Sequence, residues 1–113
     1  MHEYSIVQAL LEQIEPIADE NSAEKVTKVI VKIGVMSGVE PHLLEVAFNT
    51  FKEKTICEGA EFVMKIQPVT VHCLDCEAHS ELDVMHYRCP ECESLNIKVT
   101  DGEEMFLMTL EME

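Results

Sequence analysis

The chain has 113 residues, of which 22 are acidic and 8 basic, so its formal net charge is −14. That length is typical of a single domain, with at most a small appended module. Such a negative surface repels phosphate backbones and anionic lipid headgroups. No apolar run reaches the roughly 18 residues of a membrane span. We therefore expect neither nucleic acid nor a membrane as partner.

The first predicted element is an amphipathic helix over residues 4–20, because apolar side chains recur at helical spacing at positions 4, 7, 11, 14 and 18. Pro16 falls inside this pattern and is expected to kink the helix or end it early. Ser5 and Gln8 resemble a capping box, which would leave a short arm before the helix. The alternative is a helix that begins before Ser5 and includes it.

A strand is predicted over residues 25–35, where Val29, Val31 and Ile33 alternate with more polar positions. A second helix should open at Pro41, a residue suited to a first helical turn, and should end near residue 54. Its apolar face is formed by Leu44, Ala47, Phe48 and Phe51.

Two further strands are predicted, over residues 61–71 and 104–112, from the same two-residue alternation. The strand–helix–strand portion permits a right-handed parallel crossover. The fold class is therefore α+β: a small three-stranded mixed sheet with two helices on one face, plus an inserted four-cysteine module that resembles a zinc ribbon. We expect residues 1–71 and 102–113 to form the main domain and residues 72–101 the inserted one.

The insert contains two CxxC pairs, Cys73/Cys76 and Cys89/Cys92, separated by twelve residues. Each pair can supply two of the four ligands of a tetrahedral Zn2+ site. Two such pairs in one short segment are a specific signal for zinc. The chain between them should return as a loop or short hairpin. Four thiolates fill the coordination sphere and leave no position for an activating water, so the zinc is expected to be structural rather than catalytic.

Three histidines flank the cysteines: His72, His79 and His86. One of them could replace a thiolate or donate to a sulfur, and the plainer interpretation is that all three are solvated. Cys57 stands apart from the pairs and is interpreted as structural or incidental. The N-terminus has no basic segment followed by an apolar one, and so no secretory signal, which favours a metal over disulfides and a cytoplasmic location.

The chain opens with Met1-His2-Glu3. The terminal amine and the His2 amide nitrogen can close a five-membered ring on a metal, and the same amide and the imidazole a six-membered ring. The Glu3 amide or carboxylate can supply a fourth donor. Such a planar, nitrogen-rich set suits Ni(II) or Cu(II) better than tetrahedral zinc.

The opening Met-His-Glu-Tyr-Ser, combined with two CxxC pairs in the last third, resembles the HypA family of hydrogenase nickel-incorporation metallochaperones, which are also used for urease in some bacteria. Residues 47–51 and 104–107 extend the resemblance over the whole chain. It implies that the protein is not an enzyme, that Ni2+ as transported cargo binds at Met1, His2 and Glu3, and that structural Zn2+ binds at the four cysteines of the pairs. It also implies a HypB-type GTPase as partner and the large subunit of a [NiFe] hydrogenase as recipient.

In some members of that family a histidine follows closely on each CxxC. Here His79 lies three residues after Cys76, and Cys92 is followed by Glu93. Exchange of a zinc thiolate for an imidazole is therefore open only to His79 and His86. The alternative function is a zinc-ribbon module for protein interaction or nucleic-acid binding, against which the negative charge argues.

Overall fold

The computed structural model describes residues 3–82 and 86–113. The described residues form α1 (Glu3–Glu20), β1 (Val26–Gly34), α2 (Pro41–Phe51), β2 (Glu61–Gln67), β3 (Thr70–Cys73), β4 (His79–Glu81), β5 (Ile97–Asp101) and β6 (Met105–Met112). The chain divides into two compact units. The first, here called the helical unit, comprises Met1–Lys32, Val39–Lys65 and Phe106–Glu113, and the second, the cysteine unit, comprises Ile33–Gly38 and Ile66–Met105.

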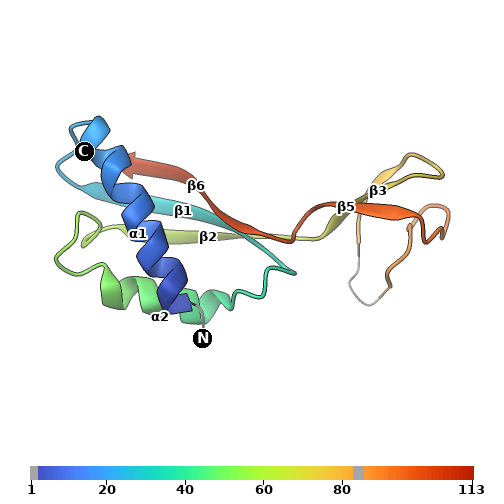
Figure 1. Cartoon of the computed structure of the whole chain (residues 1–113), viewed down its shortest axis with the longest axis horizontal. Coiled ribbons are helices and arrows are strands. Elements are labelled where there is room, and N and C mark those ends of the chain that lie inside the picture. The colour runs from blue at the N-terminus through green and yellow to red at the C-terminus, as the bar shows by residue number, and fades with distance from the viewer. Residues whose placement is uncertain (1–2, 83–85) are drawn as a thin grey trace. The chain divides into compact units, whose positions relative to one another are not determined.

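Strand β1 is the central strand of a three-stranded sheet of order β2-β1-β6, as Figure 1 shows. β6 is antiparallel to β1, since the Glu113 N–H donates to Lys25 O and the Gly34 N–H to Glu104 O at the opposite end. β2 is parallel to β1, because Lys28 near the start of β1 lies beside Glu61 at the start of β2 and the Val35 N–H just after β1 donates to Gln67 O at the end of β2. The predicted three-stranded mixed sheet is confirmed.

The two helices cover one face of this sheet (Figure 1). Val29 and Val31 of β1 are fully buried there, and the Phe48 ring of α2 stacks on Phe62 of β2 with ring centroids 4.3 Å apart. The helices bury Val7, Leu10, Ile14 and Ala18 from α1 and Leu44, Ala47 and Phe48 from α2. The predicted stripe of α1 was wrong at two positions, where Tyr4 is exposed and Leu11 is half-buried beside the buried Leu10.

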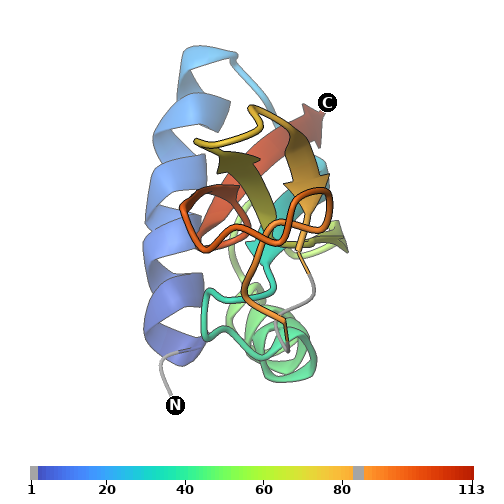
Figure 2. The same ribbon diagram turned by 90° about the vertical axis from the view of Figure 1, so that its right-hand side faces the viewer.

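Helix α1 runs unbroken to Glu20, so Pro16 neither ends nor shortens it (Figure 2). It already includes Glu3, and Ser5 therefore lies inside the helix rather than capping it. A helix that begins before Ser5 is thus the correct alternative. No helix of the described part of the chain is long and apolar enough to cross a membrane.

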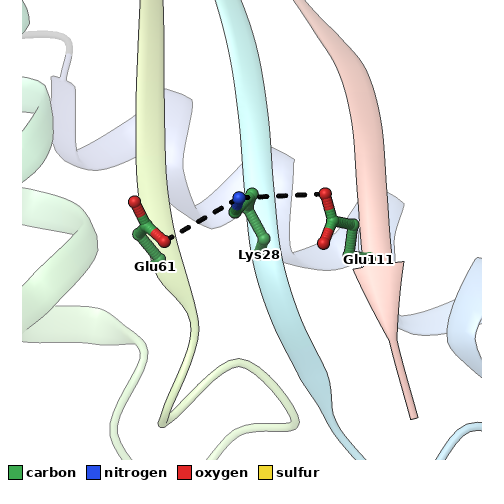
Figure 3. Close-up of polar contacts among 3 residues, drawn as sticks. All are labelled: Lys28, Glu61 and Glu111. Atoms are coloured by element: carbon green, nitrogen blue, oxygen red, sulfur yellow. Dashed lines mark ion pairs between the residues drawn. The ribbon is translucent and has the colours of Figure 1, made fainter.

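The opposite face of the sheet carries a row of charges in the helical unit. Lys28 Nζ of β1 lies 4.0 Å from Glu61 Oε1 of β2 and 3.9 Å from Glu111 Oε2 of β6 (Figure 3). The lysine alternates with the buried Val29, as a strand with one covered face requires.

The cysteine unit contains a second three-stranded sheet, of order β4-β3-β5, in which both neighbours of β3 are antiparallel to it. Its small core consists of Val69, Val71 and Leu82, with Ile97 and Val99 packed against them. The insert is therefore more than the predicted loop or short hairpin. The single strand predicted over residues 61–71 was also wrong, because it divides at Pro68, which has no N–H to donate to a ladder.

Two glycines of the cysteine unit approach each other closely. A Cβ added at Gly34 would lie 2.3 Å from Gly102 O, and one added at Gly102 would lie 2.7 Å from Val69 Cα. Gly102 also has a φ of 101°, in the range that favours glycine. Only residues without a side chain fit at this contact.

Candidate metal centres

The four cysteines of the CxxC pairs converge. Their Sγ atoms all lie within 4.8 Å of one another, with 3.6 Å separating Cys73 from Cys92 and 3.6 Å separating Cys76 from Cys89. Four sulfurs at ~2.3 Å from a tetrahedral zinc ion would be ~3.8 Å apart. All are free thiols, so the donor set fits a tetrahedral thiolate site.

The two CxxC loops are built alike. In the first, the Cys73 N–H donates to Ala78 O (2.9 Å) and the Glu77 N–H to Cys73 O (2.9 Å). The second repeats both bonds from Cys89, at 2.9 and 2.8 Å. The residue after each pair, Glu77 or Glu93, has a φ of 63°. This left-handed residue closes the tight turn that aims both sulfurs of a pair to one side.

Asp75 joins the two loops. Its carboxylate accepts hydrogen bonds from the Ser94 hydroxyl and from Asn96 Nδ2 (3.2 Å), while the Leu74 N–H donates to Asn96 O (2.9 Å). These bonds, the Ser94 bond first, hold the pKa of Asp75 below its ordinary value. The spacing between the cysteine pairs is thus maintained by contacts outside the sulfur cluster.

The thiols differ in acidity. The Cys76 N–H, which lies 3.4 Å from Cys73 Sγ, is the largest cause that lowers the pKa of Cys73 to about 7. At Cys92 the Ser94 N–H lowers the pKa, but burial and the Cys73 and Cys76 thiols raise it to about 12. The environment of Cys92 thus favours its protonated form, and a divalent cation must displace that proton to bind.

No histidine of the described residues joins this cluster. His79 lies instead beside His72 on the neighbouring strand, with His72 Nδ1 3.2 Å from His79 Nε2. His86 is also outside the cluster. The histidine pair was not predicted from the sequence, although His72 directly precedes the first CxxC and His79 follows it by three residues. Cys57 is buried, and burial raises its pKa to about 11, which disfavours the reactive thiolate form.

Of the three predicted nickel ligands, Met1 and His2 lie outside the described residues. Glu3 opens the described part of α1 and is only 6% exposed. Its Oε2 accepts a hydrogen bond from the N–H of Glu40 (3.2 Å), whose own carboxylate caps α2 by accepting from the His42 N–H. The terminal ammonium group and then the Glu40 N–H lower the pKa of Glu3 to about 2.

The chain is similar to known proteins along its whole length. A family model described as hydrogenase/urease nickel incorporation, metallochaperone, hypA, matches residues 1–112. The hydrogenase maturation factors HypA of Aquifex aeolicus (strain VF5) and Shewanella sp. (strain MR-7) are 56% and 57% identical over 113 residues, covering all of this chain and 98% and 96% of theirs. The solution structure of the Ni metallochaperone HypA from Helicobacter pylori matches with a TM-score of 0.71 and 37% identity, covering 99% of this chain and 97% of that one. This chain therefore belongs to the HypA family of hydrogenase nickel-incorporation metallochaperones, which carry a metal rather than catalyse a reaction.

Proposed function

We propose that this chain binds Ni(II) at its own N-terminus and delivers it during the maturation of a [NiFe] hydrogenase. The observation that carries the proposal is the match of residues 1–112 to a nickel-incorporation family. The ligands would be the Met1 amine, His2 and Glu3, whose donors form fused chelate rings. Urease is the second candidate recipient, because the family description names it beside hydrogenase.

Glu3 is expected to give its amide nitrogen to the metal rather than its carboxylate. The carboxylate is buried and already accepts the Glu40 N–H. The amide lies in the first turn of α1, outside the N–H to C=O ladder within the helix. Four nitrogen donors would then surround Ni(II) in a plane. The negative charge of Glu3 would offset the repulsion between a cation and the positive end of the helix.

Delivery requires a site that a partner can open. A planar ion leaves two axial positions for an incoming ligand, so a HypB-type GTPase or the hydrogenase large subunit can take the ion while the chelate rings open in turn. Protonation of His2 or of the amine would also weaken binding. We place this exchange in the cytoplasm. Copper would outcompete nickel at such a site in vitro, so selectivity depends on metal availability and on the partners.

We further propose that Cys73, Cys76, Cys89 and Cys92 hold one structural Zn2+. The Sγ separations of 3.6 Å and the matched loops support this assignment. The zinc-binding domain would then be residues 72–101, and the nickel-binding domain residues 1–71 with 102–113. A filled thiolate set leaves the zinc no role in accepting cargo.

Calorimetric titration with Ni2+ tests the nickel site. Wild-type protein should bind one tight nickel, with the diamagnetic signature of planar coordination. His2→Ala should lose that nickel while its zinc content and helical signal stay unchanged. A tag fused before Met1 should weaken binding nearly as much, because it removes the free amine, whereas the same tag after Glu113 is the matched control and should have no effect. Undiminished tight binding in His2→Ala would refute the N-terminal assignment.

A further inference from the structure

His72 and His79 face each other across two paired strands. They are directly opposed Cα partners in the antiparallel β3–β4 pair, and His72 Nδ1 lies 3.2 Å from His79 Nε2. Opposed residues of such a pair have Cβ atoms only ~5 Å apart, so the backbone itself holds the two rings together. Both side chains lie on the sheet face that alternates with the buried Val71 and Cys73, which separates them from the thiol cluster.

The separation of the two nitrogens suits a shared metal ion. With nitrogen–metal distances of ~2.0–2.1 Å, two donors 3.2 Å apart subtend an angle of about 100° at the ion. That value lies between the cis angle of an octahedron and the angle of a tetrahedron. The two-histidine edge therefore needs little movement to accept a divalent transition-metal ion.

The arrangement of the rings supports the same conclusion. Their centroids are 4.4 Å apart and their planes are tilted by 37°. A linear end-to-end N–H···N bond would hold the centroids about 5.4 Å apart, because each nitrogen lies about 1.1 Å from its ring centre. Two imidazoles on one ion would hold them at about 4.8 Å. The two rings therefore meet at an angle rather than end to end, in a hydrogen bond that a shared ion would replace.

The cysteine unit carries a net negative charge, which attracts cations at long range. Residues 72–101 contain seven acidic and two basic residues. On the face of the histidine pair, Lys98 is the cross-strand neighbour of His72 and Glu81 follows His79 along β4, opposite Thr70. Lys98 opposes an incoming cation and Glu81 attracts it, so the local charges balance while the unit as a whole is negative.

We propose that His72 and His79 form a second metal site, an open two-imidazole site for a divalent transition-metal ion such as Ni2+. Two protein donors leave the other coordination positions to water or to a ligand from a partner, so the ion would exchange quickly. Neutral imidazoles are good ligands for Ni2+, Cu2+ and Zn2+. The site would let the cysteine unit hold a transferable ion independently of the N-terminal chelate.

The test is a nickel titration of full-length, zinc-loaded, 15N-labelled His2→Ala protein followed by NMR. Ni2+ alone is the probe. An ion held by two imidazoles and water is octahedral and paramagnetic, so amides of β3 and β4 and the rings of His72 and His79 should broaden first. The broadening should saturate at one nickel per chain. Because His2 is absent, the result does not depend on the N-terminal assignment.

Introducing His79→Ala or, separately, His72→Ala into that protein should abolish the selective broadening. Zinc content and the dispersion of the amide spectrum verify that each variant is folded, and His79→Gln supplies a more conservative replacement. His42→Ala removes an exposed histidine that has no imidazole partner in the described chain and should leave the broadening intact. Broadening that survives loss of His79, is centred outside β3 and β4, or is absent would overturn the proposal.

Discussion

Glu3 links the first turn of α1 to the cap of α2 in the helical unit. Its carboxylate accepts the Glu40 N–H, and the Glu40 carboxylate in turn accepts the His42 N–H. A predicted metal ligand thus also has a structural part in joining two helices. Substitutions at this position therefore act on helix docking and, under the proposal above, on nickel, so the two effects need separate measurements.

The contribution of Glu3 to stability should depend on pH. Its folded pKa, about 2, is below the ordinary 4.5, because the terminal ammonium group and the Glu40 N–H favour the charged form. A lowered carboxyl pKa stabilises the fold above pH ~4.5, and that contribution is lost as the pH falls towards 2. Glu3→Gln should therefore melt below wild type at pH 6, and the difference in Tm should vanish near pH 2.

The difference in Tm between wild type and Glu3→Gln is measured without nickel. Protonation of the thiols affects both proteins equally, so the difference reports on Glu3 alone. Glu12→Gln is the matched control, because it makes the same charge change on the exposed face of α1. A Glu3→Gln difference that stays constant from pH 6 to pH 2 would contradict the assignment.

Gly34 should tolerate no side chain. An added Cβ would meet Gly102 O at 2.3 Å and Gly102 C at 2.4 Å, and both are backbone atoms that cannot rotate away. Gly34→Ala should lower the free energy of unfolding by about 3 kcal/mol or more, as overpacking of rigid atoms does. Gly59→Ala is the control, since nothing lies within 4 Å of its Cβ, and it should be neutral or slightly stabilising. Urea denaturation of the zinc-loaded variants measures both, and equal effects would show that the close contact does not restrict Gly34.

At the scale of elements, the strands of the cysteine unit have little apolar support. Among the described residues its core cluster buries Val69, Val71 and Leu82, so β3, β4 and β5 depend strongly on the loops that hold the sulfurs. Structural zinc binding contributes ~10–16 kcal/mol, far more than three aliphatic side chains at ~2 kcal/mol each. The proposed zinc would therefore supply most of the stability of these strands.

Removing zinc with a chelator should expose the amides of β3, β4 and β5 to fast hydrogen exchange, while those of α1 and α2 stay protected. Cys73→Ala should behave like the chelated protein because it opens the donor set. Cys57→Ala also removes one buried thiol, but it lies outside the cluster and should keep one zinc per chain. Equal loss of protection in the helices, or zinc retained by Cys73→Ala, would disprove the structural role.

Patterns between residues close in the sequence predicted the features that depend only on such neighbours. The two-residue alternation around Val29 and Val31 identified the covered face of β1, and the spacing of the cysteines identified which sulfurs would meet. The division of the strand at Pro68 was missed because the apolar alternation continues across it. The pairing of His72 with His79 depends on the register of β3 and β4. The buried residues on either side of His72, Val71 and Cys73, do not by themselves specify that register.

At the scale of the whole chain, the negative charge decides which partners can approach. A surface with a formal charge of −14 repels nucleic acid most strongly at low salt, where screening is weakest. It favours cations and partners with a basic face. The charge thus agrees with membership of a metal-carrier family and disfavours the alternative nucleic-acid module.

The protein should therefore show no mobility shift with duplex or single-stranded nucleic acid at ~50 mM salt. A basic protein of similar size is the positive control on the same gel. A micromolar complex that weakens as salt is added would show that the net charge conceals a basic surface and would revive the nucleic-acid module.

Lys28 stands between one carboxylate on each neighbouring strand (Figure 3). Such exposed pairs add little to stability, since each is screened by water and salt. Their arrangement has another effect, because a slip of β2 or β6 by one residue would turn Glu61 or Glu111 towards the apolar layer under the helices. The three charges thus raise the free energy of a misaligned sheet far more than they lower that of the aligned one. Their effect during folding is to select the correct strand register.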